Sequence, residues 1–259
     1  MNEITSMLWV EARKAWRSRM PLWTGLASLA LPLGLGFLIF VARNPDLSRQ
    51  LGLISAKADL VAYAGTDWPA YLSFFGMFIA MGGLGLFSLA MAWTFGREFV
   101  DGTVKDWLAV PVARASVLLA KFGVTAAWSA GMAVMMCASS LVIGALIGMP
   151  GATLGVVLSG TGRALLTAAL VWATITPFAF LAGVGRGYLL PIGAMMLALV
   201  AANLLALVGW ADYFPWAVPG LYAMGRATAL PVSMALVAAT ALAGMWATHA
   251  WWTHADQNK

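Results

Sequence analysis

Apolar residues dominate six long windows of the chain that contain no Asp, Glu, Lys or Arg: Pro21–Ala42, Trp68–Gly96, Phe122–Gly162, Ala164–Gly185, Gly187–Ala211 and Ala227–Ala255. A helix needs about twenty apolar residues to cross the hydrocarbon core of a bilayer. The pattern therefore predicts an all-α membrane protein of one domain, residues 1–259. We expect six transmembrane helices at approximately residues 22–41, 69–95, 122–147, 164–182, 188–208 and 229–251.

Glycine and proline predict where these windows break or bend. The longest window has room for two helices, but Gly148-Met149-Pro150-Gly151 ends one span and leaves a remainder too short for a second. Residues 152–162 are small and rich in Gly and Thr, so we expect a short external loop there. Pro32 predicts a kink in the first span.

The segment before the first window, Glu3 to Arg19, is amphipathic. On a helical wheel, Arg13, Lys14 and Arg17 fall on one side and the apolar residues on the other. The apolar set is Ile4, Leu8, Trp9, Ala12, Ala15 and Trp16. We expect a helix that lies in the membrane interface, with its basic residues toward anionic headgroups.

Composition and charge agree with a membrane location. Hydrophobic residues make up 62% of the chain and charged residues 10%, which excludes an ordinary soluble domain. The net charge of +5 would suggest nucleic acid as a partner of a soluble protein, but here we attribute it to the positive-inside rule and expect no nucleic-acid partner. With the N-terminus inside, ten Lys/Arg fall on the cytoplasmic side and five outside, so we expect a multi-pass protein of the cell membrane with both termini cytoplasmic.

One stretch between the second and third windows, Arg97 to Lys121, is dense in charge and turn residues. Asp101-Gly102 should end the preceding helix, Thr103 can cap a new one, and Pro111 should stop it. On this short helix Val104, Trp107 and Leu108 share one apolar face, with spacings i, i+3 and i+4. That face requires either a protein partner or the lipid headgroups, and the spacing alone leaves both open.

The same stretch resembles the segment between the second and third membrane helices of ABC-2 type transporter permeases. The resemblance rests on Glu98, Gly102, Thr103, Lys105, Pro111, Arg114 and Lys121. It implies that residues 103–110 form a cytoplasmic coupling helix that docks in a cleft of a separate ATPase, with Val104, Trp107 and Leu108 in the contact. It also implies an N-terminal interfacial elbow helix and, between spans five and six, short interfacial or re-entrant helices at Trp210–Arg226.

The resemblance implies a permease subunit of an exporter that works as a dimer with two copies of an ABC ATPase. The second permease chain would be identical or homologous. The sequence contains no Gly-rich phosphate loop ending in Gly-Lys-Ser/Thr. We therefore expect no enzymatic activity and no cofactor in this chain, with ATP and Mg bound by the partner ATPase. The length favours export of an antibiotic, peptide or drug; copper-enzyme (nitrous-oxide reductase) maturation and lipid or glycan export are alternatives.

Polar residues inside the spans are few. Thr174 and Thr176 either form a polar notch on a substrate pathway or satisfy carbonyl groups freed by Pro177, and we favour the second. Asn203 either lines a pathway or bonds to a neighbouring helix, and we favour the helix. We assign His249 and His254 to an aromatic belt at the membrane boundary rather than to a metal site. With no acidic residue inside the predicted spans, an ion-coupled carrier is disfavoured; it and a non-transporting sensor or immunity protein remain the rival classes.

Overall fold

The computed structural model describes residues 3–44, 67–104 and 112–254, and every regular element in these ranges is helical. Six helical units are long and apolar enough to cross a membrane: Met20–Val41, Trp68–Val100, Arg114–Leu146, Leu154–Val184, Leu189–Leu207 and Leu230–His254. The prediction of an all-α protein with six membrane-spanning helices is confirmed. Residues 45–66, between the first and second spans, lie outside the described residues.

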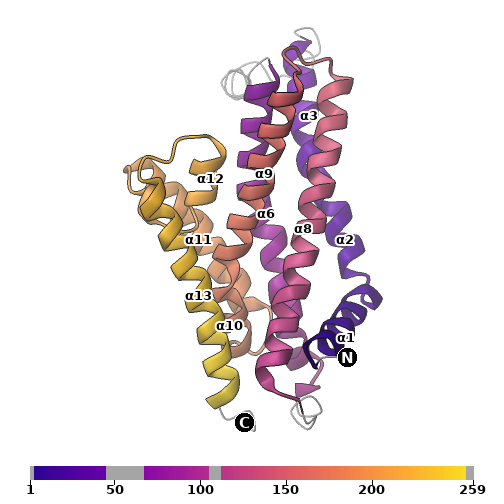
Figure 1. Cartoon of the computed structure of the whole chain (residues 1–259), viewed down its shortest axis with the longest axis vertical. Coiled ribbons are helices and arrows are strands. Elements are labelled where there is room, and N and C mark those ends of the chain that lie inside the picture. The colour runs from indigo at the N-terminus through magenta and orange to yellow at the C-terminus, as the bar shows by residue number, and fades with distance from the viewer. Residues whose placement is uncertain (1–2, 45–66, 105–111, 255–259) are drawn as a thin grey trace.

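Two long helices form the axis of the bundle. α6 (Trp68–Val100) and α8 (Arg114–Leu146) each have 33 residues. At 1.5 Å per residue each is about 50 Å long, well beyond a hydrocarbon core of about 30 Å. α6 carries much of the core, including the fully buried Tyr71, Phe75, Phe87 and Phe95. In Figure 1, α8 and the helices of residues 3–43 lie on one side of α6, and the helices of residues 177–254 lie on the other.

The first span is bent, as Pro32 predicts. It consists of α2 (Met20–Ser28) and α3 (Ala30–Arg43), which meet at Leu29. Proline lacks the amide hydrogen that would bond to the carbonyl four residues earlier, and its ring crowds that carbonyl. The helix therefore breaks one turn before Pro32.

The fourth span begins earlier than predicted. α9 (Leu154–Ile175) includes residues 154–162, so the expected loop there is wrong and only the break before Leu154 remains. Thr153 caps α9 by accepting a hydrogen bond from the amide of Val156. Gly160 lies directly against α6, where an added Cβ would be 2.5 Å from the Cδ1 atom of Leu72. Gly160 therefore serves the close packing of α9 against α6.

Pro177 divides the fourth span into α9 and α10 (Pro177–Val184). The carbonyl of Ala173 lies four residues before the proline and loses its usual partner. The Thr176 hydroxyl donates to that carbonyl at 3.1 Å and is also 3.1 Å from the carbonyl of Ala241 on α13 (Leu230–His254). The interpretation that Thr176 satisfies a carbonyl freed by the proline is confirmed.

Two short helices separate α11 (Leu189–Leu207) from α13. They are η1 (Ala211–Tyr213), a 3₁₀ turn, and α12 (Val218–Ala223), which contacts α6 and α9. Asp212 anchors the turn, because its carboxylate accepts hydrogen bonds from the hydroxyl and the amide of Thr228. These bonds lower the pKa of Asp212. The short helices occur where they were predicted, while their entry into the outer leaflet stays a prediction.

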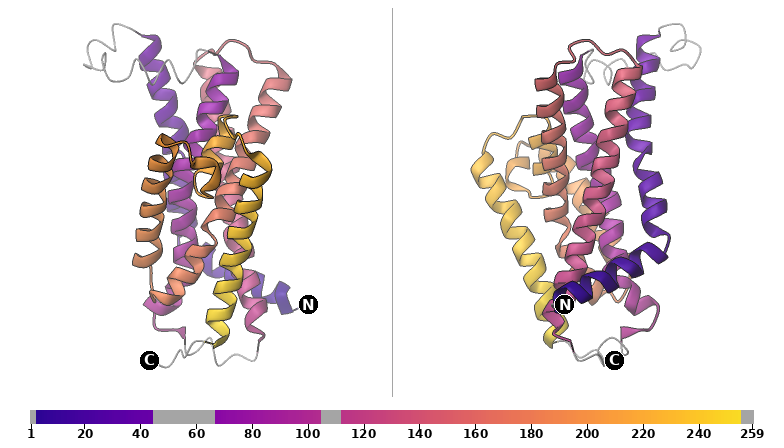
Figure 2. Two further views of the ribbon diagram at one scale, coloured as in Figure 1. Left: turned by 90° about the vertical axis from the view of Figure 1, so that its left-hand side faces the viewer. Right: turned by 45° about the vertical axis from the view of Figure 1, so that its right-hand side comes forward.

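The ends of the chain lie on one side of the bundle. α1 (Glu3–Arg17) and the last turn of α13 are at the same end as the α6–α8 connection, and the α8–α9 connection is at the other (Figures 1 and 2). An even number of spans requires this arrangement.

The orientation of the bundle can be tested with single cysteines. Thr103 and Ala152 are both exposed and lie at opposite ends. In a Cys137→Ala background, an impermeant thiol reagent added to intact cells should label Ala152→Cys and should label Thr103→Cys only after lysis. Labelling of Thr103→Cys in intact cells would contradict the orientation predicted from the positive charges.

Candidate functional site

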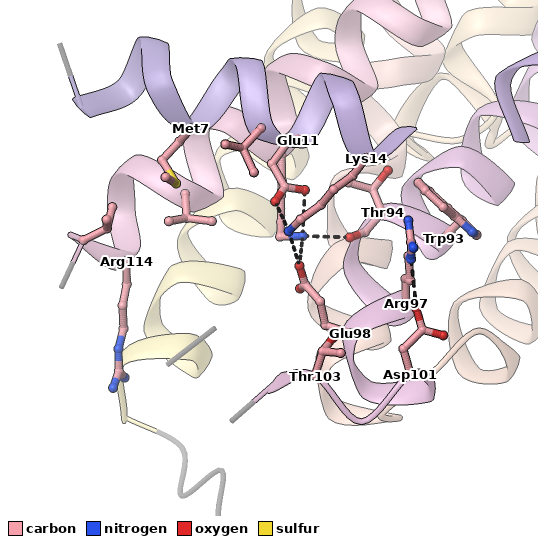
Figure 3. Close-up of a pocket in the computed structure, with 14 residues that line it drawn as sticks. Met7, Glu11, Lys14, Trp93, Thr94, Arg97, Glu98, Asp101, Thr103 and Arg114 are labelled. Carbon is pink, nitrogen blue, oxygen red and sulfur yellow. Dashed lines mark hydrogen bonds and ion pairs between the residues drawn. The ribbon is translucent and has the colours of Figure 1, made fainter. Parts of the chain in front are cut away.

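Four charged side chains meet where α1, α6 and α8 converge, and we call Glu11, Lys14, Glu98 and Lys121 the charged junction. Its centre is Lys121, which is 1% exposed. The Nζ atom of Lys121 is 2.7 Å from Glu98 Oε1 and 3.2 Å from Glu11 Oε2, and it donates to the carbonyl of Thr94 at 3.0 Å. Figure 3 shows Glu11 and Lys14 from α1 and Glu98 from α6 directed toward one another.

The junction satisfies its central charge completely. An ammonium group has three N–H donors, and each of the three acceptors around Lys121 can take one. Lys14 adds a second cation, 2.6 Å from Glu11 Oε1 and 3.4 Å from Glu98 Oε1. Two lysines thus balance two carboxylates, as a buried ionic group requires.

The charge on Glu11 is stabilised by its neighbours. Burial acts to raise the pKa of the carboxyl, but the ammonium groups of Lys121 and Lys14 outweigh it, so the pKa lies below its ordinary value. Glu11 therefore remains ionised at neutral pH. The stability that the junction draws from this group is present above the ordinary glutamate pKa and is lost as the pH falls through the lowered value.

The junction corrects the expected orientation of α1. Lys14 was predicted to face the headgroups together with Arg13 and Arg17. Instead its ammonium group bonds to Glu11 on the same helix and to Glu98 on α6. Trp9 and Trp16 are 57% and 83% exposed, so the aromatic side of α1 is left for the bilayer. The face of α1 that contacts α6 and α8 therefore combines the ion pairs of Glu11 and Lys14 with Leu8 and Ala15 of the apolar stripe.

The end of α6 is fixed next to the junction. Gly102 has φ = 70°, in the left-handed region, and the amide of Thr103 donates to the carbonyl of Glu98 at 3.0 Å. With the bond from Gly102 to Phe99, this is the Schellman arrangement that commonly ends helices. The predicted helix break at Asp101-Gly102 is confirmed, although α6 runs on past Phe95 to Val100 and so includes Glu98.

Hydrogen bonds connect the beginning of α8 to α1 and to α13. Glu3 on α1 accepts a hydrogen bond from the amide of Ala113 at 2.8 Å. Arg114 Nη1 donates to the carbonyl oxygens of Trp252 and Thr253 at 2.6 and 3.2 Å, which places a cation on the C-terminal end of α13. The ring centroids of Trp252 and of Phe99 on α6 are 5.4 Å apart.

These helix ends surround a cavity of about 480 Å³ at the same end of the molecule. Its wall includes the charged junction together with Arg97, Asp101, Thr103 and Arg114 (Figure 3). Within the residues that the structure describes, Glu98 Oε2 has no hydrogen-bond partner. A charged hollow thus adjoins both ends of the α6–α8 connection.

The predicted contact residues divide into three groups. Gly102, Thr103 and Arg114 are exposed, and Val104, Glu98 and Lys121 are buried. Lys105, Trp107, Leu108 and Pro111, and with them most of the predicted coupling helix, lie outside the described residues. The role of all of these residues in binding an ATPase stays a prediction.

The candidate pathway residues are dispersed. The Thr174 hydroxyl donates to the carbonyl of Val171 in its own helix, and Thr176 joins α9 to α13. Asn203 is exposed on α11 and donates to the carbonyl of Leu199 at 2.8 Å, and among the described residues the favoured interhelical bond is not found. Asn203 does line a separate cavity of about 210 Å³ between α6, α11 and α12.

Sequence reasoning missed the partners of Lys121. Lys121 was assigned to ATPase binding and Lys14 to the side of the N-terminal helix that faces the headgroups, while Glu11 was given no role. A signal was present, because Lys121 begins a long apolar window and needs a counter-charge if it is buried. The acid–base pair Glu11/Lys14, three residues apart on an amphipathic helix, was the available partner.

Six helical units long and apolar enough to cross a membrane define a helical integral membrane protein. The family described as ABC-2 family transporter protein matches residues 7–203, most of the chain, and the protein belongs to that family. A similar protein is the bacitracin transport permease protein BCRB of Bacillus licheniformis, with 24% identity over 174 residues, 64% of this chain and 81% of that protein. No solved structure matches the chain.

Loss of the central ammonium should be costly. Lys121→Met leaves two buried carboxylates with Lys14 alone, and removal of one partner from a buried ion pair typically costs about 3–5 kcal/mol. We expect a clear fall in the thermal unfolding temperature of the purified protein, while Arg97→Gln, which breaks the exposed Arg97–Asp101 pair, should cost less than about 1 kcal/mol.

A double-mutant cycle separates the ion pairs from other effects of the substitution. The variant Lys121→Met/Glu11→Gln should lose less stability than the sum of its two single variants, because Glu11→Gln removes a carboxylate that Lys121→Met leaves under-compensated. Additive losses would contradict the assigned pairing.

Proposed function

We propose that this chain is the membrane-spanning permease subunit of an ABC exporter, driven by a separate ATPase that docks on residues 103–110. One observation carries the proposal: the charged junction and the Arg114 contacts tie both ends of the α6–α8 connection to the outer helices of the bundle. A force applied at that connection would therefore reach several spans at once.

The proposed coupling has two routes. Lys121 joins α8 to α1 and α6, and α1 continues into the first span. Arg114 and Phe99 join the same connection to the end of α13 in the sixth span. Closure of the ATPase dimer around ATP and Mg would move the docked segment, and the two routes would pass that motion to spans one and six.

The candidate contact residues take different roles in this proposal. Val104, Lys105, Trp107 and Leu108 would supply direct contacts with the ATPase, flanked by Gly102, Thr103 and Pro111. Glu98 and Lys121 are buried, so they would act through the helices that they join. Arg114 would hold the start of α8 against α13.

The assembly that we propose contains two permease chains and two ATPase subunits. Each chain has one α6–α8 connection, and ATPases of this kind act as pairs, so a single permease chain would leave one ATPase subunit without a partner. The second permease chain would be identical or homologous.

We propose an antibiotic or peptide as the exported substrate. The name of the similar Bacillus licheniformis protein, a bacitracin transport permease, supports this class. An ion-coupled carrier would require transport that persists without ATP hydrolysis. Transport that continues with a hydrolysis-deficient ATPase would therefore contradict the proposal.

Trp107 is the residue that tests ATPase docking most directly. An aromatic side chain desolvated in a groove dominates such an interface, and its truncation typically costs about 2 kcal/mol or more, roughly a thirtyfold loss of affinity. Trp107→Ala should leave the protein inserted in the membrane but should weaken ATPase binding by at least that factor and uncouple hydrolysis from transport. Binding can be measured by titration of the purified ATPase against the permease in nanodiscs.

The matched control is Trp246→Ala. Trp246 is 72% exposed on α13 and lies within a membrane-spanning helix, so its loss should leave ATPase affinity unchanged. Normal ATPase binding by Trp107→Ala would instead assign the apolar face of residues 103–110 to the lipid headgroups.

A further inference from the structure

A long apolar groove runs between α1, α2 and α8, on the bilayer side of the N-terminal helices. It consists of two adjoining cavities of about 390 and 430 Å³ that share Trp16, Pro21, Gly25 and Met135. We call this surface the α1–α2–α8 groove. It is separate from the charged junction, and only one charged side chain, Arg19, lines either cavity.

Small residues keep the groove open. A Cβ added to Gly131 on α8 would meet no atom within 4 Å, and one added to Gly25 on α2 would lie 3.4 Å from the Cε atom of Met135. The indole of Trp128 donates to the hydroxyl of Thr24 at 3.0 Å and so holds α8 and α2 at a fixed spacing. The groove is therefore a defined feature of the fold.

The mouth of the groove is basic and lies at the membrane boundary. Arg19 stands in the turn between α1 and α2 with φ = 60°, and its side chain is exposed. Within the described part of the chain no ion pair involving Arg19 is found. Arg13 and Arg17 are also exposed on the adjoining helix, beside the exposed ring of Trp16.

The apolar groove and the arginine at its mouth together indicate which kind of ligand fits. An apolar channel that begins at a cation in the interface suits a molecule with a long hydrocarbon chain and an anionic head. A second copy of this chain suits it less well, because a two-fold contact would bring Arg13, Arg17 and Arg19 against the same residues of the partner.

We propose that the α1–α2–α8 groove binds an anionic phospholipid from the leaflet that borders α1. One acyl chain lies along Gly25, Gly131 and Met135, and the phosphate is held by Arg19. The bound lipid fills the space beside the hinge between the interfacial helix and the first span.

The test uses the full-length protein purified in detergent, titrated with phosphatidylglycerol or with phosphatidylcholine of the same acyl chains. Native mass spectrometry counts the lipids retained per chain. The wild type should retain one phosphatidylglycerol in preference to phosphatidylcholine. Arg19→Gln should lower the affinity for phosphatidylglycerol about fivefold, because a basic side chain near an anionic lipid surface contributes about 1 kcal/mol.

Two controls match the charge and the shape changes. Arg226→Gln removes an exposed arginine outside the groove, beside the separate cavity between α6, α11 and α12, and should leave retention unchanged. Gly131→Leu fills the groove and should abolish retention of both lipids, whereas Gly34→Leu, at another open glycine on α3, should not.

Three results would overturn the proposal. The first is equal retention of the two lipids by the wild type, and the second is unchanged retention by Gly131→Leu. The third is a Gly131→Leu variant that loses a protein dimer while it keeps its lipid, since the groove would then hold a second copy of the chain.

Discussion

The cost of burying the ammonium of Lys121 constrains the whole cytoplasm-proximal end of this structure as we orient it. A lone lysine at 1% exposure would lose its proton or open the fold, since a charge taken from water needs compensation. Here α1 and α6 each supply a carboxylate, and α6 adds a backbone carbonyl. The position of the N-terminal helix is therefore determined by an electrostatic requirement of α8, some 110 residues later in the chain.

This requirement explains why the two helices that exceed the membrane thickness do not separate at that end. α6 finishes in a Schellman turn at Gly102, and the amide of Ala113, the N-cap residue of α8, is bonded to Glu3. Arg114 extends the same set of contacts to the last carbonyls of α13. A permease that receives motion from an ATPase at one connection needs such a stiff base, because a frayed helix end would absorb the displacement. Under the proposed coupling, the polar interactions at this end would serve the mechanism as well as stability.

Much of the architecture could be predicted from the sequence, because membrane-spanning helices depend mainly on local apolar length. Six charge-free windows correspond to six helices, and Pro32 and Pro177 correspond to breaks. The prediction failed at Gly160, because glycine occurs both in loops and at close helix contacts. Gly160 was assigned to a loop, but it lies in α9 and allows that helix to approach Leu72. The prediction failed again at Lys121, whose partners lie on other helices, and at Lys14, which bonds to Glu98 on α6 as well as to Glu11 on its own helix. A helical wheel shows no contact between helices. Asn203 was expected to bond to a neighbouring helix, but its amide can bond to a carbonyl of its own helix.

Because Lys121 joins α1, α6 and α8, we expect α1 and the end of α6 to move together with α8 as one rigid unit. Double electron–electron resonance can test it with spin labels on cysteines at Arg13 and Val100, two exposed positions, in a Cys137→Ala background. The permease would be assembled with an ATPase that hydrolyses ATP and compared without nucleotide and in a trapped ATP state. We expect one narrow distribution of the distance between the two labels, the same without nucleotide and in the trapped ATP state. This distribution should broaden when Lys121→Met is added. A distance that changes between the two states in the otherwise wild-type protein would contradict it.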